Sequence, residues 1–478
     1  MKKSFFQHFL VISSGTLISM CIGLFTTPII TRLVDPDQYG ILSLFTMYSS
    51  IILMVCCIGL DQALVRYYYN STESEYKTSI FYKCAILPIV LGCGCALCLI
   101  FLKYLGIDIF NFSWSELLCF CFYMILQIIN RFSVLLLRLE YKSSQYTIVN
   151  IVNKVSYIVL ALFFLKLLSM KGVTPLIYAT VIAYLIATLL SLMMGRDIWL
   201  VKKNKKTVGV TFRELIKYGS PFILSMGITT LFQYLDKISL SIFCGYEEVG
   251  IYASASSLIA VFALVQSTFN TLWSPMSIEH FERDPDDRKY YIKVNEAISF
   301  VMLGIGICLL ASSNLIVLLL GEKYRKASTI IPFLMFNPIM YTISETTVNG
   351  IVFMKKSQWH IITALGACLT NIVGNILLVP IFAGEGAAIS TGLSYIVFFT
   401  LRTLLSNKVF YINFKLKKFY LVLSFVVIYA FYCTFFNNTM IIIFGGVIEL
   451  IVLFFAYRSV CREGILLIKD RLRRWKKC

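Results

Sequence analysis

The chain consists largely of apolar runs of about 20 residues or more, separated by short polar stretches. A helical run of that length crosses a hydrocarbon core of about 30 Å. Helices are required because lipid offers no hydrogen-bond partner to an exposed backbone amide. The pattern predicts an all-α polytopic membrane protein of about 14 transmembrane helices. The expected spans are 9–31, 40–62, 80–102, 115–137, 144–168, 174–195, 215–243, 249–273, 294–320, 328–353, 359–382, 386–407, 417–436 and 440–460.

The composition excludes a soluble fold. Only 14% of the 478 residues are charged, against roughly 25% in a soluble domain, so too little polar sequence remains to cover a globule. The net charge is +18, but no soluble fold presents those cations, which argues against nucleic acid as a partner. No metal site is expected, because most cysteines lie inside apolar runs and the three histidines are scattered.

The basic residues also predict an orientation. With the N-terminus in the cytoplasm, most of the 43 Lys and Arg fall at inward-facing helix ends and loops. The outward side then receives only Arg32, Lys103, Lys166, Lys171, Lys323, Arg325 and Lys326. Because cytoplasmic loops collect Lys and Arg, both termini are expected inside.

An internal repeat predicts the domain organisation. Asp37 and Glu247 stand at matching acidic turns, each followed by a Gly-Ile pair that opens a helix. The spacing indicates two pseudo-symmetric six-helix lobes, 1–200 and 201–411, followed by a helix pair and a basic cytoplasmic tail in 412–478. Transporters use such parallel repeats to alternate access around a central site.

Three stretches carry a family resemblance. They are residues 28–41 (PIITRLVDPDQYGI), 235–253 (LDKISLSIFCGYEEVGIYA, leading to Trp273-Ser274-Pro275) and 371–391 (NIVGNILLVPIFAGEGAAIST). With them the chain resembles the Wzx-type oligosaccharide flippases of the polysaccharide transporter family. That family lies within the wider MOP superfamily, which includes multidrug-extrusion transporters and the lipid II flippase.

The resemblance implies a function that composition could not show. The cargo would be an undecaprenyl-diphosphate-linked sugar repeat unit, for example of O-antigen, moved from the cytoplasmic to the outer leaflet of a bacterial inner membrane. Membrane lipids and polysaccharide polymerase or assembly proteins would be the other partners. No cofactor is implied, although transport could be coupled to H⁺ or Na⁺.

Ionisable groups inside spans indicate where such a cargo would bind. Each costs about 2.5–3.5 kcal/mol to insert into the membrane, so such groups usually serve a function. We expect Arg131 and Lys154 to hold the diphosphate, with Lys237 contributing from the other lobe and Asn150 and Asn153 lying close by. Arginine suits phosphate through its bidentate fork and lysine as a point charge. Alternatively, Lys154 pairs with a carboxylate in a structural role and Arg131 snorkels to the interface.

Other residues have two interpretations each. Asp236 and Glu345 are candidates for ion coupling, or structural partners of buried cations. Asp61, Arg66 and Arg138 lie at inner helix ends, where anchoring is the simpler role.

Several further residues bear on helix shape and packing. Asn371 and Asn375, at positions i and i+4, are expected to hydrogen-bond between helices. The prolines that mark kinks, which would be either hinges or tolerated irregularities, are Pro28, Pro221, Pro332 and Pro338.

Two rival functions share this class of fold. A small-molecule exporter would be expected to stop near twelve helices, whereas two more spans follow here. A polysaccharide polymerase or ligase would need a large outward loop for its catalytic residues, and the loops here are short. No phosphate-binding loop signature is present, so ATP hydrolysis is not expected, and the chain is predicted not to be an enzyme.

Overall fold

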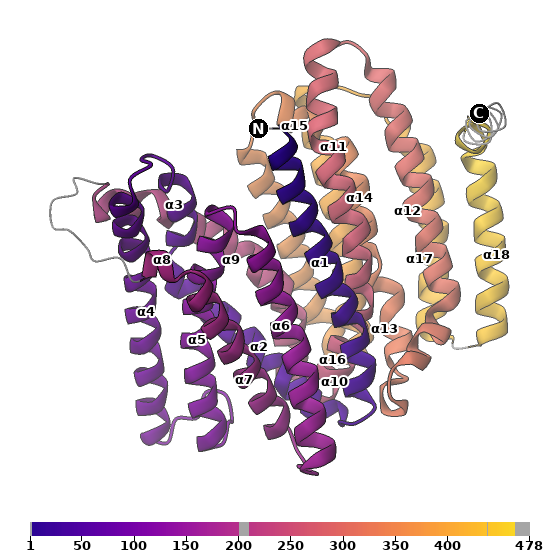
Figure 1. Cartoon of the computed structure of the whole chain (residues 1–478). Helices are drawn as coiled ribbons and strands as arrows, with labels where there is room; N and C mark the ends of the chain where they lie inside the picture. The colour runs from indigo at the N-terminus through magenta and orange to yellow at the C-terminus, as the bar shows by residue number, and fades with distance from the viewer. Residues whose placement is uncertain (1, 200–209, 437, 464–478) are drawn as a thin grey trace, which may run out of the picture. The chain divides into compact units, whose positions relative to one another are not determined.

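The computed structural model describes residues 2–199, 210–436 and 438–463. Within these ranges every regular element is helical (Figure 1). The basic tail that was expected at the C-terminus lies mostly outside the described residues.

The described residues hold twelve helices that are long and apolar enough to cross a membrane. One of them, α16 (Gln358–Val409), contains a break at Ala383 and so counts as two arms. The helix α1 (Lys2–Thr31) adds a shorter apolar stretch, Leu17–Thr31. The all-α polytopic fold is therefore confirmed, and the number of spans agrees with the expected total of about 14.

The chain divides into two compact units, Met1–Tyr234 and Leu235–Cys478. The boundary falls inside α9 (Phe212–Phe243). Both acidic turns of the repeat are present, since Asp37 lies in the first turn of α2 and Glu247 in that of α10. The lobe limits 200/201 and 411/412 remain predictions.

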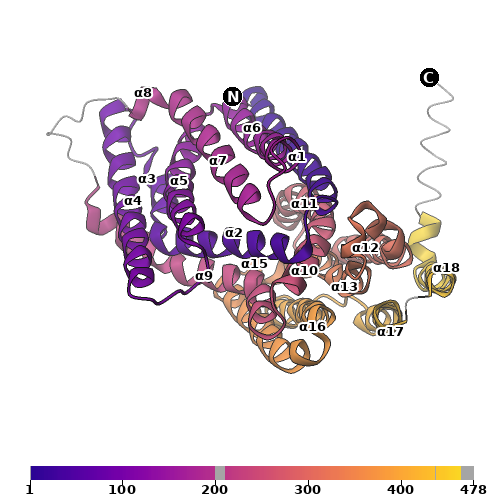
Figure 2. The ribbon, with the colours of Figure 1, turned by 90° about the horizontal axis from the view of Figure 1, so that it is seen from below.

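The first unit contains α1, the beginning of α9 and seven α-helices between them. These are α2 (Pro36–Cys57), α3 (Leu60–Tyr67), α4 (Ser74–Tyr104), α5 (Trp114–Leu139), α6 (Ser143–Leu162, continued by the π-helical turn Phe163–Leu167), α7 (Thr174–Met194) and α8 (Arg196–Trp199). The helix α7 packs against α5 and α6, α1 packs against α6, and α2 packs against α4 and α5 (Figure 2). Helix α5 begins with a capping box in which Ser113 and Glu116 satisfy each other's backbone amides.

The sequence-based span 40–62 was wrong at its end. The helix α2 stops at Cys57 because Ile58 (φ 49°) and Gly59 (φ 69°) both adopt left-handed conformations. A separate short helix, α3, then begins at Leu60. Asp61 and Arg66 are therefore not at the end of a long span but on this short helix.

The second unit contains the rest of α9 and the helices that follow it. They are α10 (Tyr246–Ile259), α11 (Ala263–Arg283), α12 (Arg288–Ile316), α13 (Ala327–Leu334), α14 (Phe336–Thr347), α15 (Asn349–Phe353), α16, α17 (Leu416–Phe435) and α18 (Thr439–Ala456). The almost fully buried α13 packs against α10, α12, α16 and α17. The additional C-terminal pair, α17 and α18, packs against α12.

Candidate functional site

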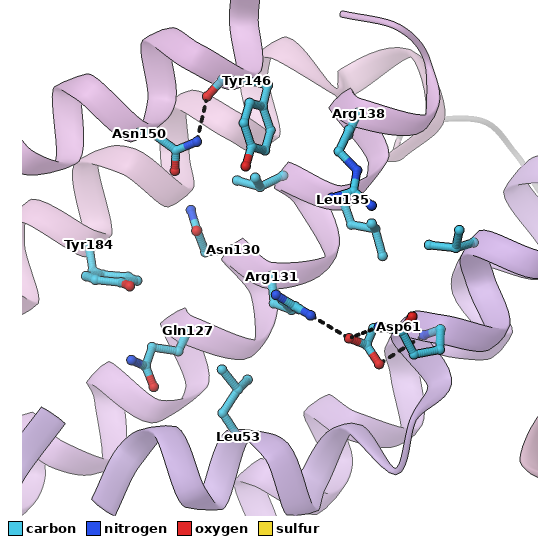
Figure 3. A pocket seen from close by; sticks show the side chains of 13 residues that line it. Leu53, Asp61, Gln127, Asn130, Arg131, Leu135, Arg138, Tyr146, Asn150 and Tyr184 are labelled. Carbon is cyan, nitrogen blue, oxygen red and sulfur yellow. Dashed lines mark hydrogen bonds and ion pairs between the residues drawn. The ribbon is translucent and has the colours of Figure 1, made fainter. Parts of the chain in front are cut away.

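Arg131 of α5 lies at the centre of the candidate site, which is contained in the first unit. Its Nη2 is 2.7 Å from Oδ2 of Asp61 on α3 (Figure 3). The two partners differ in exposure, since 48% of the Arg131 side chain is accessible but only 5% of the Asp61 side chain. The pair is thus a buried carboxylate joined to a half-exposed guanidinium.

The break between α2 and α3 positions Asp61. Gly59 has a positive φ and packs against the backbone of α9, where a Cβ on Gly59 would lie 2.1 Å from the carbonyl oxygen of Gly219. Only glycine fits so close to another backbone. Asp61 follows in the first turn of α3, where the helix dipole favours a carboxylate. It also accepts hydrogen bonds from the backbone N–H and Nε2 of Gln62, at 2.9 and 3.3 Å.

The ion pair borders two cavities of contrasting chemistry. The first, which we call the polar cavity, has a volume of about 340 Å³ and is lined by α3, α5, α6 and α7 together with Leu53. The second, the apolar cavity, has a volume of about 420 Å³ and lies between α2 and α9. Leu53, Asp61 and Arg131 line both cavities.

The polar cavity offers groups suited to an anion and to hydroxyl groups. Its polar lining is Asp61, Gln62, Gln127, Asn130, Arg131, Arg138, Tyr146, Asn150 and Tyr184. The Oε1 atom of Gln127 and the Nδ2 atom of Asn130 are buried without a hydrogen-bond partner among the described residues. Buried polar atoms normally have partners, so these two are open to a ligand in the cavity.

The apolar cavity has a different lining. Its apolar lining includes Leu53, Met54, Cys57, Ile223 and Met226, and Ser50, Thr229 and Thr230 add hydroxyl groups. The Arg131–Asp61 pair is its charged element. A ligand that reached both cavities would have a polar part, a negative charge at Arg131 and an apolar part.

The structure brings together only some of the predicted binding residues. Arg131 and Asn150 line the polar cavity, and Asn150 donates from Nδ2 to the carbonyl of Tyr146 at 3.1 Å. Asn153 is half-buried and Lys154 is exposed on α6, and neither lines the two cavities. Lys237 lies on the part of α9 that belongs to the second unit.

Arg138 and Asp61, interpreted from the sequence as anchors, instead line the polar cavity. Sequence reasoning also missed Gln127 and Asn130. Their spacing with Arg131 carried the signal, since residues i, i+3, i+4 and i+11 of a helix fall close to one face. A polar stripe within the apolar run 115–137 would have identified this wall of the cavity.

Asp236 is buried in the second unit among neutral donors. Its Oδ1 accepts from Nδ2 of Asn371 and of Asn375, at 3.1 and 2.8 Å. Its Oδ2 accepts from the hydroxyls of Thr391 and Tyr252. The prediction that the two asparagines hydrogen-bond between helices is confirmed, because α16 carries them and α9 carries Asp236.

Glu345 has a basic partner, Arg402, that the sequence analysis did not single out. Nη1 of Arg402, on α16, lies 2.7 Å from Oε1 of Glu345 on α14. Only 7% of the Arg402 side chain is exposed. An arginine near the end of the run 386–407 has the pattern of an interfacial anchor, which is why it was overlooked.

The four prolines all lie within helices. Pro28 is inside α1 and Pro221 is inside α9. Helix α13 ends two residues after Pro332, and Pro338 lies in the first turn of α14. Whether any of these positions acts as a hinge remains a prediction.

Comparisons with known proteins agree with this architecture. A family model described as a polysaccharide biosynthesis protein matches residues 5–281. An uncharacterized membrane protein of Methanocaldococcus jannaschii is 25% identical over 418 residues, which are 80% of this chain and 80% of that protein.

Solved structures share the fold. The lipid II flippase MurJ in an inward closed conformation matches with a TM-score of 0.70 and 17% identity, over 95% of this chain and 100% of that one. An inward-facing multidrug resistance MATE family transporter of the MOP superfamily matches with a TM-score of 0.55 and 16% identity, over 82% of this chain and 94% of that one. At this identity the likeness concerns the fold, and these neighbours are a flippase and a transporter rather than enzymes.

Proposed function

Since the chain belongs to the polysaccharide biosynthesis protein family and shares its fold with a lipid II flippase, we propose that it flips lipid-linked oligosaccharides. The cargo would be an undecaprenyl-diphosphate-linked repeat unit, moved from the cytoplasmic to the outer leaflet by alternating access of two lobes. The observation that carries the proposal is Arg131, a half-exposed guanidinium that borders a polar and an apolar cavity.

The proposed headgroup contacts follow from the cavity lining. Arg131 binds the diphosphate, and Arg138, two turns further along α5, provides a second cation on the same wall. Gln127, Asn130 and Asn150 hydrogen-bond the sugar hydroxyls. The aromatic rings of Tyr146 and Tyr184 offer stacking surfaces for the sugar. Lys154, Asn153 and Lys237 remain proposed contacts at other stages of transport.

Asp236 is the better candidate for coupling to H⁺ or Na⁺. It is surrounded by neutral amides and hydroxyls, which allow a carboxylate either to take up a proton or to share a cation. Glu345 has Arg402 as a fixed counter-ion, which leaves it less able to exchange one. Replacing Asp236 with Asn should remove any dependence of transport on an imposed ion gradient.

The proposed setting is a bacterial inner membrane with both chain termini in the cytoplasm. The orientation rests on the distribution of Lys and Arg between the loops. Polysaccharide polymerase or assembly proteins would act on the cargo after it reaches the outer leaflet.

Deletion of the gene in its native host tests the proposed function. Lipid-linked repeat units should accumulate on the cytoplasmic face while their synthesis continues. Complementation with the wild type should restore export, and Arg131→Gln should not, although its membrane level stays normal. The matched control is Arg66→Gln, which removes an exposed arginine of α3 that lines neither cavity. Units that still reach the outer leaflet in the deletion strain would refute the assignment.

A second candidate is a cation-coupled exporter of small molecules with the same architecture. The apolar cavity, with a volume of about 420 Å³, favours it, because small ligands occupy pockets of about 300–1,000 Å³. Increased sensitivity of the deletion strain to amphipathic drugs, with normal flipping of repeat units, would favour this alternative. A polymerase or ligase is the less supported choice.

A further inference from the structure

We propose that Asp61 is a built-in competitor for Arg131, and that the diphosphate of the cargo displaces its carboxylate when it binds. The inference rests on the proposed function, because it takes an anionic lipid as the ligand. It assigns Asp61 a role in selectivity. The site contains its own anion, and a ligand must outcompete that anion to bind Arg131.

The exposure of the two partners supports an exchange. The buried member is the carboxylate and the accessible member is the guanidinium. Arg131 forms its ion pair with Asp61 through one nitrogen, Nη2. A guanidinium has five N–H donors, so most of them remain available for an incoming anion.

Asp61 keeps other hydrogen bonds after it loses Arg131. The backbone N–H and the side-chain Nε2 of Gln62 both donate to it. Its place in the first turn of α3 adds the favourable end of the helix dipole. The displaced carboxylate would therefore not be left as an isolated buried charge, which is the usual obstacle to breaking such a pair.

The position of the pair between two cavities supports an amphiphilic ligand. Asp61 and Arg131 line both the polar and the apolar cavity. When a diphosphate takes the place of Asp61, the sugars would lie on the side of Gln127 and Asn150. The first apolar units of the lipid would lie on the side of Met54 and Met226. The same ion pair thus separates the space for the two halves of the cargo.

The exchange predicts selectivity for charge. A diphosphate carries more negative charge than a carboxylate and can bind the guanidinium fork through two oxygens. It should displace Asp61 more readily than a monophosphate does. A neutral prenyl alcohol should not displace Asp61 at all.

The test measures binding to the purified full-length protein in lipid nanodiscs. The probes are geranylgeranyl diphosphate, geranylgeranyl monophosphate and geranylgeraniol. Asp61→Asn removes the charge and keeps an acceptor for the Gln62 N–H. It should tighten binding of the diphosphate by about five- to tenfold. It should also reduce the preference for diphosphate over monophosphate, and leave geranylgeraniol unchanged.

Matched variants isolate the effect. Arg131→Gln and the double variant Asp61→Asn with Arg131→Gln should both lose the charge-dependent binding. Asp37→Asn removes an exposed carboxylate from the first turn of α2 and should behave as the wild type. If Asp61→Asn does not fold, Asp61→Ser serves in its place, since it also removes the charge and retains an acceptor.

The outcomes separate this inference from the proposed function. Equal or weaker diphosphate binding by the Asp61 variants, or no binding by any variant, would overturn the role of Asp61 even if export in cells requires the protein. Tighter binding by Asp61→Asn together with normal flipping in the deletion strain would support the exchange. The normal flipping in that strain would refute the proposal that the protein transports the repeat unit.

Discussion

Each unit contains an arginine paired with a carboxylate at the same distance, but the two pairs lie in different surroundings. Arg131 and Asp61 are 2.7 Å apart, as are Arg402 and Glu345. The first guanidinium borders two cavities. The second lies over the rings of Tyr341 and Phe398, at 5.4 and 5.3 Å.

The two pairs have the same kinds of charged group, so their accessibility decides whether a ligand can replace the carboxylate. Nη1 of Arg402 also donates to the hydroxyl of Ser344 at 2.7 Å, and the side chain is almost fully enclosed. Its side chain is only 7% exposed, so it is much less accessible to a ligand than Arg131 at 48%. Arg402–Glu345 therefore acts as a brace between α16 and α14. Arg131–Asp61 is accessible and can exchange its partner.

Removal of Arg402 should have the largest effect on stability. Arg402→Gln leaves Glu345, whose side chain is 16% exposed, without its counter-ion, which costs up to about 3 kcal/mol. We expect strongly reduced protein in the membrane and a lower thermal unfolding temperature in detergent. Replacing both partners with Met should recover much of the loss, because the unpaired charge is gone. A stable Arg402→Gln protein would show that the brace is unimportant.

Gly59→Ala should disturb the first pair indirectly. The new Cβ would meet the Gly219 carbonyl oxygen at 2.1 Å, and the positive φ adds strain of about 1–3 kcal/mol. Lower thermal stability and tighter diphosphate binding are expected together, since Gly59 positions Asp61 and a displaced Asp61 competes less well for Arg131. The control is Gly94→Ala on α4, where a Cβ meets nothing within 4 Å. Equal stability of the two variants would contradict the close contact between α3 and α9.

Arg131→Gln should separate function from stability. Hydrogen bonds to charged groups contribute about 1.5–3 kcal/mol, so flipping should fall by more than about tenfold. The unfolding temperature should fall less than in Arg402→Gln, because Asp61 also accepts two hydrogen bonds from Gln62. Flipping is measured with labelled lipid-linked repeat units in proteoliposomes. Equal losses of stability in the two variants would remove the distinction between an exchangeable pair and a brace.

A third carboxylate, Glu140, lies outside the spans and should make a small, pH-dependent contribution to stability. Burial alone would raise the pKa of Glu140, but hydrogen bonds from Tyr68 and Lys77 and the charges of Lys77 and Lys142 outweigh it, so the pKa is lowered. A carboxylate with a lowered pKa stabilises the fold at pH values above its ordinary pKa of 4.5. This contribution is lost as the pH falls below 4.5. The wild type should keep its stability advantage over Glu140→Gln from pH 7 to about pH 5 and lose it as the pH falls below 4.5, measured by thermal unfolding. A pH-independent difference would contradict the assignment.

The sequence predicted the features that depend only on the residues of one continuous apolar stretch. The spans follow from hydropathy, and Arg131 stands out because an arginine inside an apolar run is costly. The i, i+4 spacing of Asn371 and Asn375 correctly indicated a shared bonding face. These conclusions need no knowledge of which helices are neighbours.

The sequence could not predict the features that depend on tertiary contacts. Asp61 resembles an interfacial anchor until the left-handed residues before it and the backbone of Gly219 place it beside α5. Arg402 looks like an anchor for the same reason, because its partner lies 57 residues away in the chain. The lobe boundaries, the orientation and the roles of Lys154 and Lys237 remain predictions.

The internal pairing of Arg131 with Asp61 has an electrical consequence. When no cargo is bound, Asp61 cancels the charge of Arg131, so the site moves one charge fewer through the membrane field as the carrier resets. An unpaired arginine carried across the field would cost about 2.3 kcal/mol per 100 mV. The return step should therefore depend more strongly on an imposed voltage in Asp61→Asn than in the wild type, measured in proteoliposomes.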